Sequence, residues 1–298
     1  MTSAASVKAR LKNQAVASGK TMQEVLTAYG LERTVFRLSV SEYTERFTLK
    51  GGIFLYALFD GEYARVTRDI DLLARNMPNS VEDMRSVFED IFFIECDDAL
   101  RYDLSTLKIQ EISEFKKYHG VRVSIAAYLD RIKIPISIDV GFGDVIYPDR
   151  VKMEFPTLLD MEIPQIYAYS IYSAIAEKFE AIASLGDANS RYKDFYDIFV
   201  LAGRCELLGM ELKEAVSETF ERRGTSFTDI FAFEEDFMES DIHQRRWKAF
   251  LKKKKAMIHA DFAEVILLLK RLLLPVVDSI ENDIEFSSVW DNESLKWE

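Results

Sequence analysis

Apolar residues recur at helical spacing along the first forty residues of the chain. Val7, Leu11 and Ala15 are four residues apart, and the same periodicity resumes after a break at Gly19. Residues three or four apart lie on one face of a helix. We therefore predict that residues 3–40 form a small helical cap with a break near Gly19.

Two glycines open the next apolar segment. Gly51 and Gly52 precede the apolar run 53–59, which is predicted to be a short buried helix. Glycine has no side chain, so the backbone can approach a phosphate group closely. A helix that begins there also offers unpaired N–H groups and a positive dipole end. The pair is either a phosphate-binding turn or only a tight turn.

An Asp-Ile-Asp sequence follows this helix on an apolar segment that is predicted to be a strand. Side chains alternate along a strand, so Asp69 and Asp71 point to one face while Ile70 points into the core. Two carboxylates on one face can share magnesium ions, which bind oxygen ligands and contact substrate phosphates. The alternative for this sequence alone is a solvated strand edge.

A helix and three strands are predicted next. Helical spacing covers residues 80–94, and period-2 alternation indicates strands within 104–109, 121–125 and 134–140. In the last strand the isoleucines occupy one face, which places Asp139 on the other. Asp139 either adds a third carboxylate to the metal site or only begins the turn that follows.

The composition changes after Pro156 and Pro164, from where the chain is predicted to be helical to its end. This change predicts two domains, residues 1–160 and 161–298. From residue 166 to 184, isoleucines form an apolar stripe that also contains Lys178. The Lys178 ammonium either reaches back to water or meets phosphate oxygens at the acidic site.

A second charged segment begins at Arg191 and opens another predicted helix. Its aromatic residues form the buried side, and Arg191, Asp194 and Asp197 lie together on an adjacent face at spacings of three. A local salt bridge between Lys193 and Asp197 is the alternative to a functional role.

Composition limits the class of protein. With 298 residues, 48% hydrophobic and 30% charged, the chain is predicted to be globular and to form one or two domains. The net charge of −12 argues against a surface that coats nucleic acid generally. Two cysteines are too few for a disulfide framework, and no apolar run indicates a secretory signal or a membrane span. We expect a cytoplasmic protein with no membrane partner.

The ordered set of motifs resembles the AbiEii/AbiGii toxin family, which belongs to the polymerase-beta-like nucleotidyltransferase superfamily. The resemblance covers about residues 45 to 205 and rests on four segments: Leu49-Lys50-Gly51-Gly52, Thr67-Arg68-Asp69-Ile70-Asp71-Leu72, Ala176-Glu177-Lys178-Phe179 and Arg191-Tyr192-Lys193-Asp194-Phe195-Tyr196-Asp197.

The resemblance implies an α+β fold, in which a nucleotidyltransferase domain with a mixed sheet and flanking helices precedes a mainly helical domain. It implies Mg2+, with Mn2+ as an alternative, and a nucleoside triphosphate (NTP) as substrate. The implied metal ligands are Asp69, Asp71 and Asp139, and the implied catalytic residues are these three with Lys178 and Asp194. Nucleotide binding is assigned to Gly51, Gly52, Lys50, Arg68, Arg191, Lys193 and Asp197.

The resemblance also implies the toxin of a bacterial toxin–antitoxin pair of the phage-defence type, with an antitoxin partner and transfer RNA as a candidate acceptor. A basic run at residues 245–255, interleaved with Trp247 and Phe250, suits RNA phosphates and base stacking, or is a solvated helix face. Two other interpretations stay open: a nucleotidyltransferase that modifies a small molecule or protein, and a catalytically silent binding protein.

Overall fold

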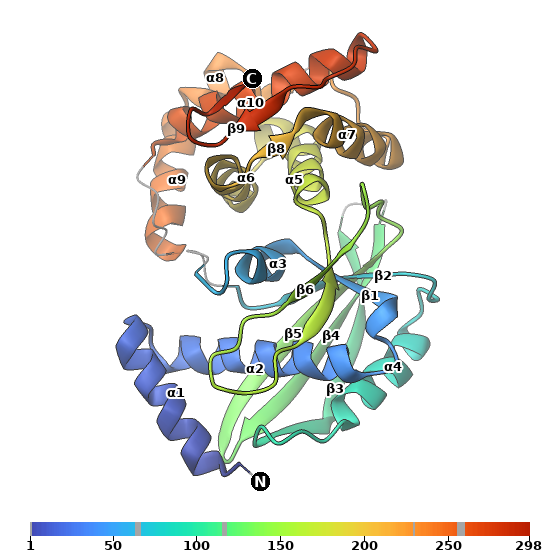
Figure 1. Ribbon diagram of the computed structural model, residues 1–298, viewed down its shortest axis with the longest axis vertical. Helices are drawn as coiled ribbons and strands as arrows, with labels where there is room; N and C mark the ends of the chain where they lie inside the picture. The colour runs from blue at the N-terminus through green and yellow to red at the C-terminus, as the bar shows by residue number, and fades with distance from the viewer. Residues whose placement is uncertain (1, 63–66, 115–117, 229, 255–259) are drawn as a thin grey trace. The chain divides into compact units, whose positions relative to one another are not determined.

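The computed structural model describes residues 2–62, 67–114, 118–228, 230–254 and 260–298 (Figure 1). The chain divides into two compact units. The first unit comprises Met1–Gly143 and Val151–Tyr169, and the second comprises Asp144–Arg150 and Ser170–Glu298. The sequence placed the division at residues 160 and 161, whereas the contacts change between Tyr169 and Ser170.

The first unit is built on a seven-stranded mixed sheet with the strand order β3-β4-β5-β2-β1-β7-β6. The pairs β2–β5 and β1–β7 are parallel, and the other neighbouring pairs are antiparallel. The strands are β1 Phe47–Lys50, β2 Ile70–Ala74, β3 Leu100–Glu114, β4 Tyr118–Leu129, β5 Ile132–Phe142, β6 Val151–Glu154 and β7 Gln165–Ala168.

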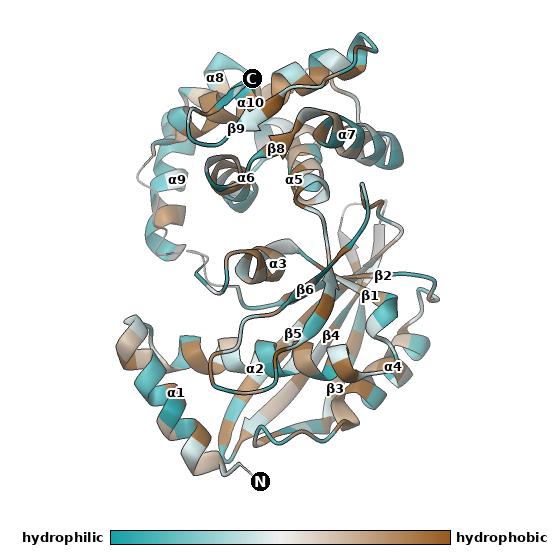
Figure 2. Ribbon diagram, in the orientation of Figure 1, coloured by the Kyte–Doolittle hydropathy of each residue, from teal (hydrophilic) through white to brown (hydrophobic). Residues whose placement is uncertain are grey.

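The helices of this unit confirm the patterns read from the sequence. The cap consists of two helices separated near Gly19, and Ser80 caps the helix that follows β2. The four helices are α1 Ala4–Ser18, α2 Met22–Val40, α3 Gly51–Leu58 and α4 Val81–Phe93, with a 3-10 turn at Thr44–Arg46. Figure 2 shows α3 coloured mostly as hydrophobic, as its burial requires.

Helix α2 covers the apolar face of β5. A Cβ at Gly30 would lie 2.7 Å from a methyl carbon of Ile134 and 2.9 Å from one of Ile136, so the helix backbone lies directly on the strand. Ile134, Ile136 and Ile138 are at most 2% exposed. Alternation along β5 then places Asp139 on the opposite face, where it is half-buried.

The second unit is mainly helical. It contains α5 Ile171–Leu185, α6 Tyr192–Arg204, α7 Gly209–Arg223, α8 Glu235–Met238, α9 Asp241–Lys254 and α10 Phe262–Glu281, with 3-10 turns at Gly186–Ala188 and Phe231–Phe233. It also contains a small sheet with the strand order β10-β9-β8, formed by β8 Leu207–Leu208, β9 Val289–Asp291 and β10 Lys296–Trp297. The combination of a mixed sheet with a mainly helical part confirms the predicted α+β fold.

The prediction of helix from Pro164 to the end of the chain was wrong at the short strands β7, β8, β9 and β10. Residues 165–168 form β7, a strand inside the sheet, so helix α5 begins at Ile171 rather than at residue 166. The C-terminal segment contributes β9 and β10. These strands are two to four residues long, too short for alternation to distinguish them from neighbouring helix.

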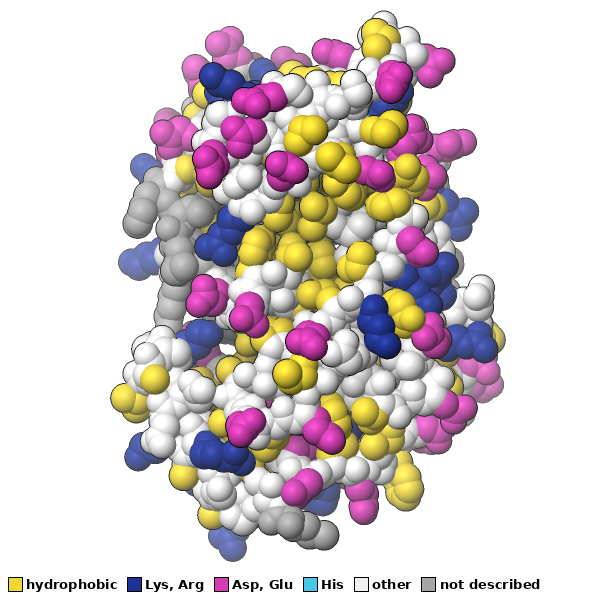
Figure 3. All heavy atoms as spheres, viewed as in Figure 1, with side chains coloured by type: hydrophobic (Ala, Val, Ile, Leu, Met, Phe, Trp, Pro, Cys, Tyr) yellow, Lys and Arg dark blue, Asp and Glu magenta, His cyan; other side chains and the backbone are white. Residues whose placement is uncertain are grey.

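The surface matches the acidic composition. On the face in view, Asp and Glu side chains are spread widely rather than gathered in one place (Figure 3). Among the described residues, no helix is both long and apolar enough to cross a membrane.

Candidate metal and nucleotide site

The turn between β1 and α3 lies directly against Asp71. Antiparallel pairing of β1 with β2 sets Lys50 opposite Asp71, and the next residue, Gly51, has a φ of +64°. A Cβ at Gly51 would lie 2.6 Å from Asp71 Cγ, so any side chain there would displace the carboxylate. The glycine is therefore required twice, for its backbone conformation and for space.

Helix α3 begins at this turn, and Gly52 is buried in its first turn. Among the described residues, no side chain caps its N-terminus. The first N–H groups of a helix lack partners within the helix, and the dipole favours negative charge there. The turn predicted as a phosphate-binding site thus has the backbone geometry for an anion.

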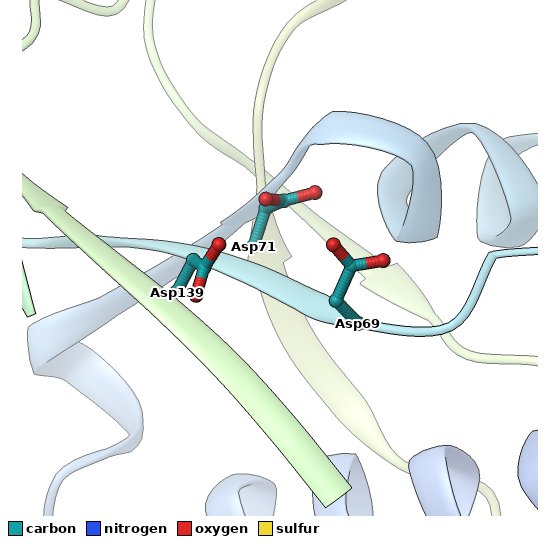
Figure 4. Close-up of side chains that lie close together, drawn as sticks. All are labelled: Asp69, Asp71 and Asp139. Carbon is teal, nitrogen blue, oxygen red and sulfur yellow. The ribbon is translucent and has the colours of Figure 1, made fainter. Parts of the chain in front are cut away.

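Three carboxylates gather beside this turn, and we call them the aspartate cluster. Asp69 immediately precedes β2, Asp71 lies on it, and the parallel pairing of β2 with β5 sets Asp71 opposite Asp139. One oxygen from each residue lies within 4.8 Å of the other two (Figure 4). Like charges at this spacing repel, and oxygen ligands from three carboxylates suit a hard divalent cation.

Arg122 contacts the aspartate cluster from the next strand. It lies opposite Asp139 in the β4–β5 ladder, and its guanidinium donates from Nε to Oδ1 and from Nη2 to Oδ2, both at 2.7 Å. The side chains are 46% and 23% exposed. This bidentate pair was not predicted from the sequence, although alternation placed Arg122 on the polar side of its strand.

Two other residues assigned to nucleotide binding lie at the same end of β1 and β2. Lys50 Nζ lies 3.5 Å from the Tyr169 hydroxyl and 5.3 Å from the centre of its ring, which holds the lysine over the aromatic face. Arg68 is exposed, and its backbone N–H donates to Asp69 Oδ1 at 3.3 Å. Lys50 therefore lies across the β1–β2 ladder from Asp71, and Arg68 is next to Asp69 in sequence.

The second unit holds the other predicted residues, which form a lysine network of Lys178, Arg191, Asp194 and Asp197. Lys178 Nζ donates to Asp197 Oδ2 at 2.6 Å and lies 3.6 Å from Asp194 Oδ1. Arg191 Nε donates to Asp194 Oδ2 at 2.7 Å.

Three members of this network are buried and one is exposed. Lys178, Asp194 and Asp197 are 8%, 2% and 0% exposed, whereas Arg191 is exposed and so is Lys193. Lys178 thus faces inward, as its place in the apolar stripe indicates. Asp194 and Asp197 were placed beside the buried side of their helix, but they are buried as well because they pair with Lys178. Buried charges cost several kcal/mol unless they are paired, and here each carboxylate has a cation.

The structure thus brings the predicted residues together in two groups. Asp69, Asp71 and Asp139 lie with the Gly51 turn in the first unit, and the lysine network lies in the second. The aspartate cluster combines residues on or next to β2 and β5, and the lysine network combines residues on or next to α5 and α6.

The basic run lies on α9, and one part of its interpretation was wrong. Trp247 is fully buried, and its indole N–H donates to the Ala260 carbonyl at 3.0 Å, so it does not stack on bases. Arg245, Arg246, Lys248, Lys252 and Lys253 are exposed. The Lys254 side chain and Lys255 lie outside the described residues.

Comparisons with known proteins assign the family. The model for the nucleotidyl transferase AbiEii toxin of type IV toxin–antitoxin systems matches residues 33–266. The chain belongs to the AbiEii nucleotidyltransferase toxin family. The matched range contains every residue of the aspartate cluster and of the lysine network, and it confirms the resemblance read from the sequence motifs.

Two solved structures are similar at low identity. JHP933 from Helicobacter pylori is 14% identical with a TM-score of 0.43, covering 85% of this chain and 92% of that one. A candidate nucleotidyltransferase from the same organism is 13% identical with a TM-score of 0.45, covering 86% and 96%. No curated protein matches this AbiEii-family chain significantly.

Proposed function

We propose that this protein transfers a nucleotidyl group from an NTP to an RNA acceptor such as transfer RNA, and that it is the toxin of a toxin–antitoxin pair. The observation that carries the proposal is the aspartate cluster, three carboxylates gathered beside the turn that opens α3. Family membership supports the reaction class and the toxin role.

The donor set fits a divalent metal of the magnesium type. Asp69, Asp71 and Asp139 offer only oxygen ligands, which hard divalent cations prefer. Bound Mg2+ or Mn2+ would stabilise charge on the attacking and leaving oxygens of a phosphoryl group in line. These three residues are the proposed ligands.

The chain's own residues would seat the nucleotide. The N–H groups at Gly51 and Gly52 face the triphosphate, with Lys50 and Arg68 as nearby cations. An acceptor hydroxyl then attacks the α-phosphorus, the bond to the bridging oxygen of the β-phosphate breaks, and pyrophosphate leaves. Holding the two reactants in line removes much of the entropic barrier to this step.

The hydroxyl proton needs an acceptor, and Asp139 is our candidate. Both of its oxygens accept from Arg122, so Asp139 would take the proton only after one of these hydrogen bonds is released. The proton transfer is therefore linked to movement of the Arg122 guanidinium.

Lys178 is proposed to contact the nucleotide phosphate, as the family resemblance implies, with Asp194 as the partner that orients it. In the structure Lys178 is bonded to Asp197, so phosphate contact requires the ammonium to share its three donors. Arg191 and Lys193 are exposed, so their charged ends are accessible to a phosphate, although Arg191 also binds Asp194.

The exposed basic residues of α9 support an RNA acceptor over a small molecule or a protein. Arg245, Lys248 and Lys252 follow at spacings of three and four, which places them on one side of the helix. The whole chain carries a charge of −12, so a cationic helix face is a local exception suited to a polyanion. A cognate antitoxin is the second proposed partner.

Acceptor classes can be separated with one labelling experiment. Purified protein is incubated with NTPs labelled at the α-phosphate, Mg2+ and either total RNA, a small-molecule extract or a protein extract. The proposal predicts label in RNA of transfer-RNA size. Label only in small molecules or proteins would refute the RNA acceptor, and no label with any acceptor would refute the enzyme.

The role of α9 has its own test. Replacing Arg245, Lys248 and Lys252 by Gln should weaken RNA binding and make it less dependent on salt, by about one unit of slope for each lost phosphate contact. Lys8, Lys12 and Lys20, exposed on or beside α1, provide the matched triple replacement. Equal losses of RNA affinity in the two triple variants would show that α9 is not part of the acceptor site.

A further inference from the structure

Arg122 enters the proposed reaction only as the partner that must release Asp139. The β4–β5 register sets it on the sheet face that carries Asp71 and Asp139, and its guanidinium binds both oxygens of Asp139. Asp139 is one of the three proposed metal ligands. A cation of the chain therefore already binds part of the site that a metal ion would enter.

The chemistry of the guanidinium allows a second partner. Its planar fork matches the two oxygens of a carboxylate and those of a phosphate equally well. The Arg122 side chain is 46% exposed, so its pair with Asp139 is partly solvated. Exposed ion pairs contribute at most about 1 kcal/mol. The Arg122 guanidinium can therefore exchange the Asp139 carboxylate for two oxygens of a phosphate group at little energetic cost.

We propose that Arg122 is a nucleotide-binding residue that exchanges partners. Without nucleotide its guanidinium binds Asp139. When a nucleoside triphosphate binds, the guanidinium moves to the phosphate oxygens and releases Asp139 to the metal. This inference rests on the proposed nucleotidyltransferase site and deepens it by assigning the triphosphate a further ligand.

The exchange makes nucleotide and metal binding favour each other. Triphosphate removes the cation that competes with the metal for Asp139, and by thermodynamic linkage the metal favours triphosphate equally. The site would then bind a divalent ion weakly on its own and hold it firmly only with the nucleotide present.

Metal-free nucleotide binding provides the first test. A fluorescent nucleoside triphosphate is titrated in EDTA against Asp139→Asn and Asp69→Asn, which remove the same charge from the aspartate cluster. Only Asp139→Asn also removes the carboxylate that Arg122 binds. It should therefore bind the triphosphate up to about fivefold more tightly than Asp69→Asn, the value of one exposed ion pair.

A double variant shows whether Arg122 causes that difference. In Arg122→Gln with Asp139→Asn, the advantage over Arg122→Gln with Asp69→Asn should disappear. A nucleoside monophosphate should show a smaller advantage than the triphosphate in every pair. Equal affinities of Asp139→Asn and Asp69→Asn for the triphosphate would overturn the proposal.

Metal binding without nucleotide provides the second test, and it does not depend on activity. Electron paramagnetic resonance of Mn2+ should show tighter binding by Arg122→Gln than by the wild type, and Arg122→Lys should lie between them. Arg101→Gln, an exposed arginine of β3 in the same sheet, is the control and should not change the affinity. Weaker Mn2+ binding by Arg122→Gln would mean that Arg122 only orients Asp139.

The two proposals can fail separately. If the wild type transfers label but the aspartate variants do not differ, the partner exchange is wrong and the function stands. If no variant binds nucleotide or Mn2+, both are wrong.

Discussion

The two charged clusters of this protein differ in how their charges are balanced. The aspartate cluster brings three carboxylates together on a half-buried sheet face, with oxygens within 4.8 Å. The lysine network joins two cations to two carboxylates, three of the four residues being at most 8% exposed. A fold requires buried charges to be balanced, whereas gathering like charges contributes nothing to its stability. The aspartate cluster therefore indicates a bound ligand, whereas the lysine network also stabilises the fold.

The largest expected effect is the loss of a partner in the lysine network. Asp197→Ala leaves the Lys178 ammonium buried without its 2.6 Å partner, so unfolding free energy should fall by about 3 to 5 kcal/mol in urea titration. Lys193→Met, an exposed residue of the same helix, should change it by less than about 0.5 kcal/mol. If Asp197→Ala were as stable as the wild type, the network would not belong to the framework.

The first unit contains a buried carboxylate, Glu32, that also has a cation beside it. It tests whether a nearby cation is enough to keep a buried carboxylate ionised. Burial raises the pKa of Glu32 to about 7, from 4.5, although it accepts the Leu158 N–H and lies 3.5 Å from Arg33. Because the folded protein holds this proton more tightly than the unfolded chain, stability should fall as pH rises from about 4.5 to 7 and then level off.

Glu32→Gln removes this titration and should therefore flatten the dependence. At pH 8 it should be more stable than the wild type by up to about 3 kcal/mol, and near pH 4.5 the two should be similar. Urea titrations across the range, with the exposed Glu42→Gln as control, measure it. Parallel pH curves for Glu32→Gln and the wild type would show that Glu32 is ionised in the folded state.

A smaller effect is expected at the turn that supports the aspartate cluster. Gly51→Ala combines a positive φ, which costs about 1 to 2 kcal/mol for a residue with a Cβ, with a clash against the Asp71 carboxylate. Thermal unfolding should show that loss, and Mn2+ affinity should fall at the same time because Asp71 is displaced. Stability loss with unchanged Mn2+ affinity would separate the turn from the metal site.

The smallest stability effect should be at the aspartate cluster itself. Asp69→Asn removes one of three repelling charges, so without metal the midpoint of thermal unfolding should be unchanged or slightly raised. Adding Mg2+ should raise the midpoint of the wild type but not that of the variant. A large destabilisation by Asp69→Asn would show that the aspartate cluster stabilises the fold as the lysine network does.

Local patterns were enough to predict the turn, the strands and the residues of the aspartate cluster. Alternation places Asp71 and Asp139 on polar faces, and Gly51 precedes an apolar helix, so each assignment depends only on near neighbours. The short strand β7 has too few residues to show a pattern, and its identity depends on pairing with β1 and β6.

Arg122 was missed because its partner is on another strand, yet the sequence contained a signal. Leu129 pairs with Ile132 around a two-residue turn at Asp130, which has a φ of +54°. Arg122 lies seven residues before Leu129, and Asp139 lies seven residues after Ile132. A hairpin turn sets strand register, so identifying the turn would have predicted the pair. The partner of Lys178 depends on helix packing and had no such signal.

Transfer of labelled nucleotide by Asp71→Asn tests whether the aspartate cluster is the catalytic metal site. The wild type, Asp71→Asn and the control Glu111→Gln, an exposed acid of the same sheet, are compared with α-labelled NTP, Mg2+ and total RNA at equal folded concentration. We predict that Asp71→Asn loses at least about 100-fold in rate, since it removes a ligand of the metal that would stabilise the reacting phosphate, while Glu111→Gln keeps the wild-type rate. Transfer by folded Asp71→Asn at the wild-type rate would contradict the account.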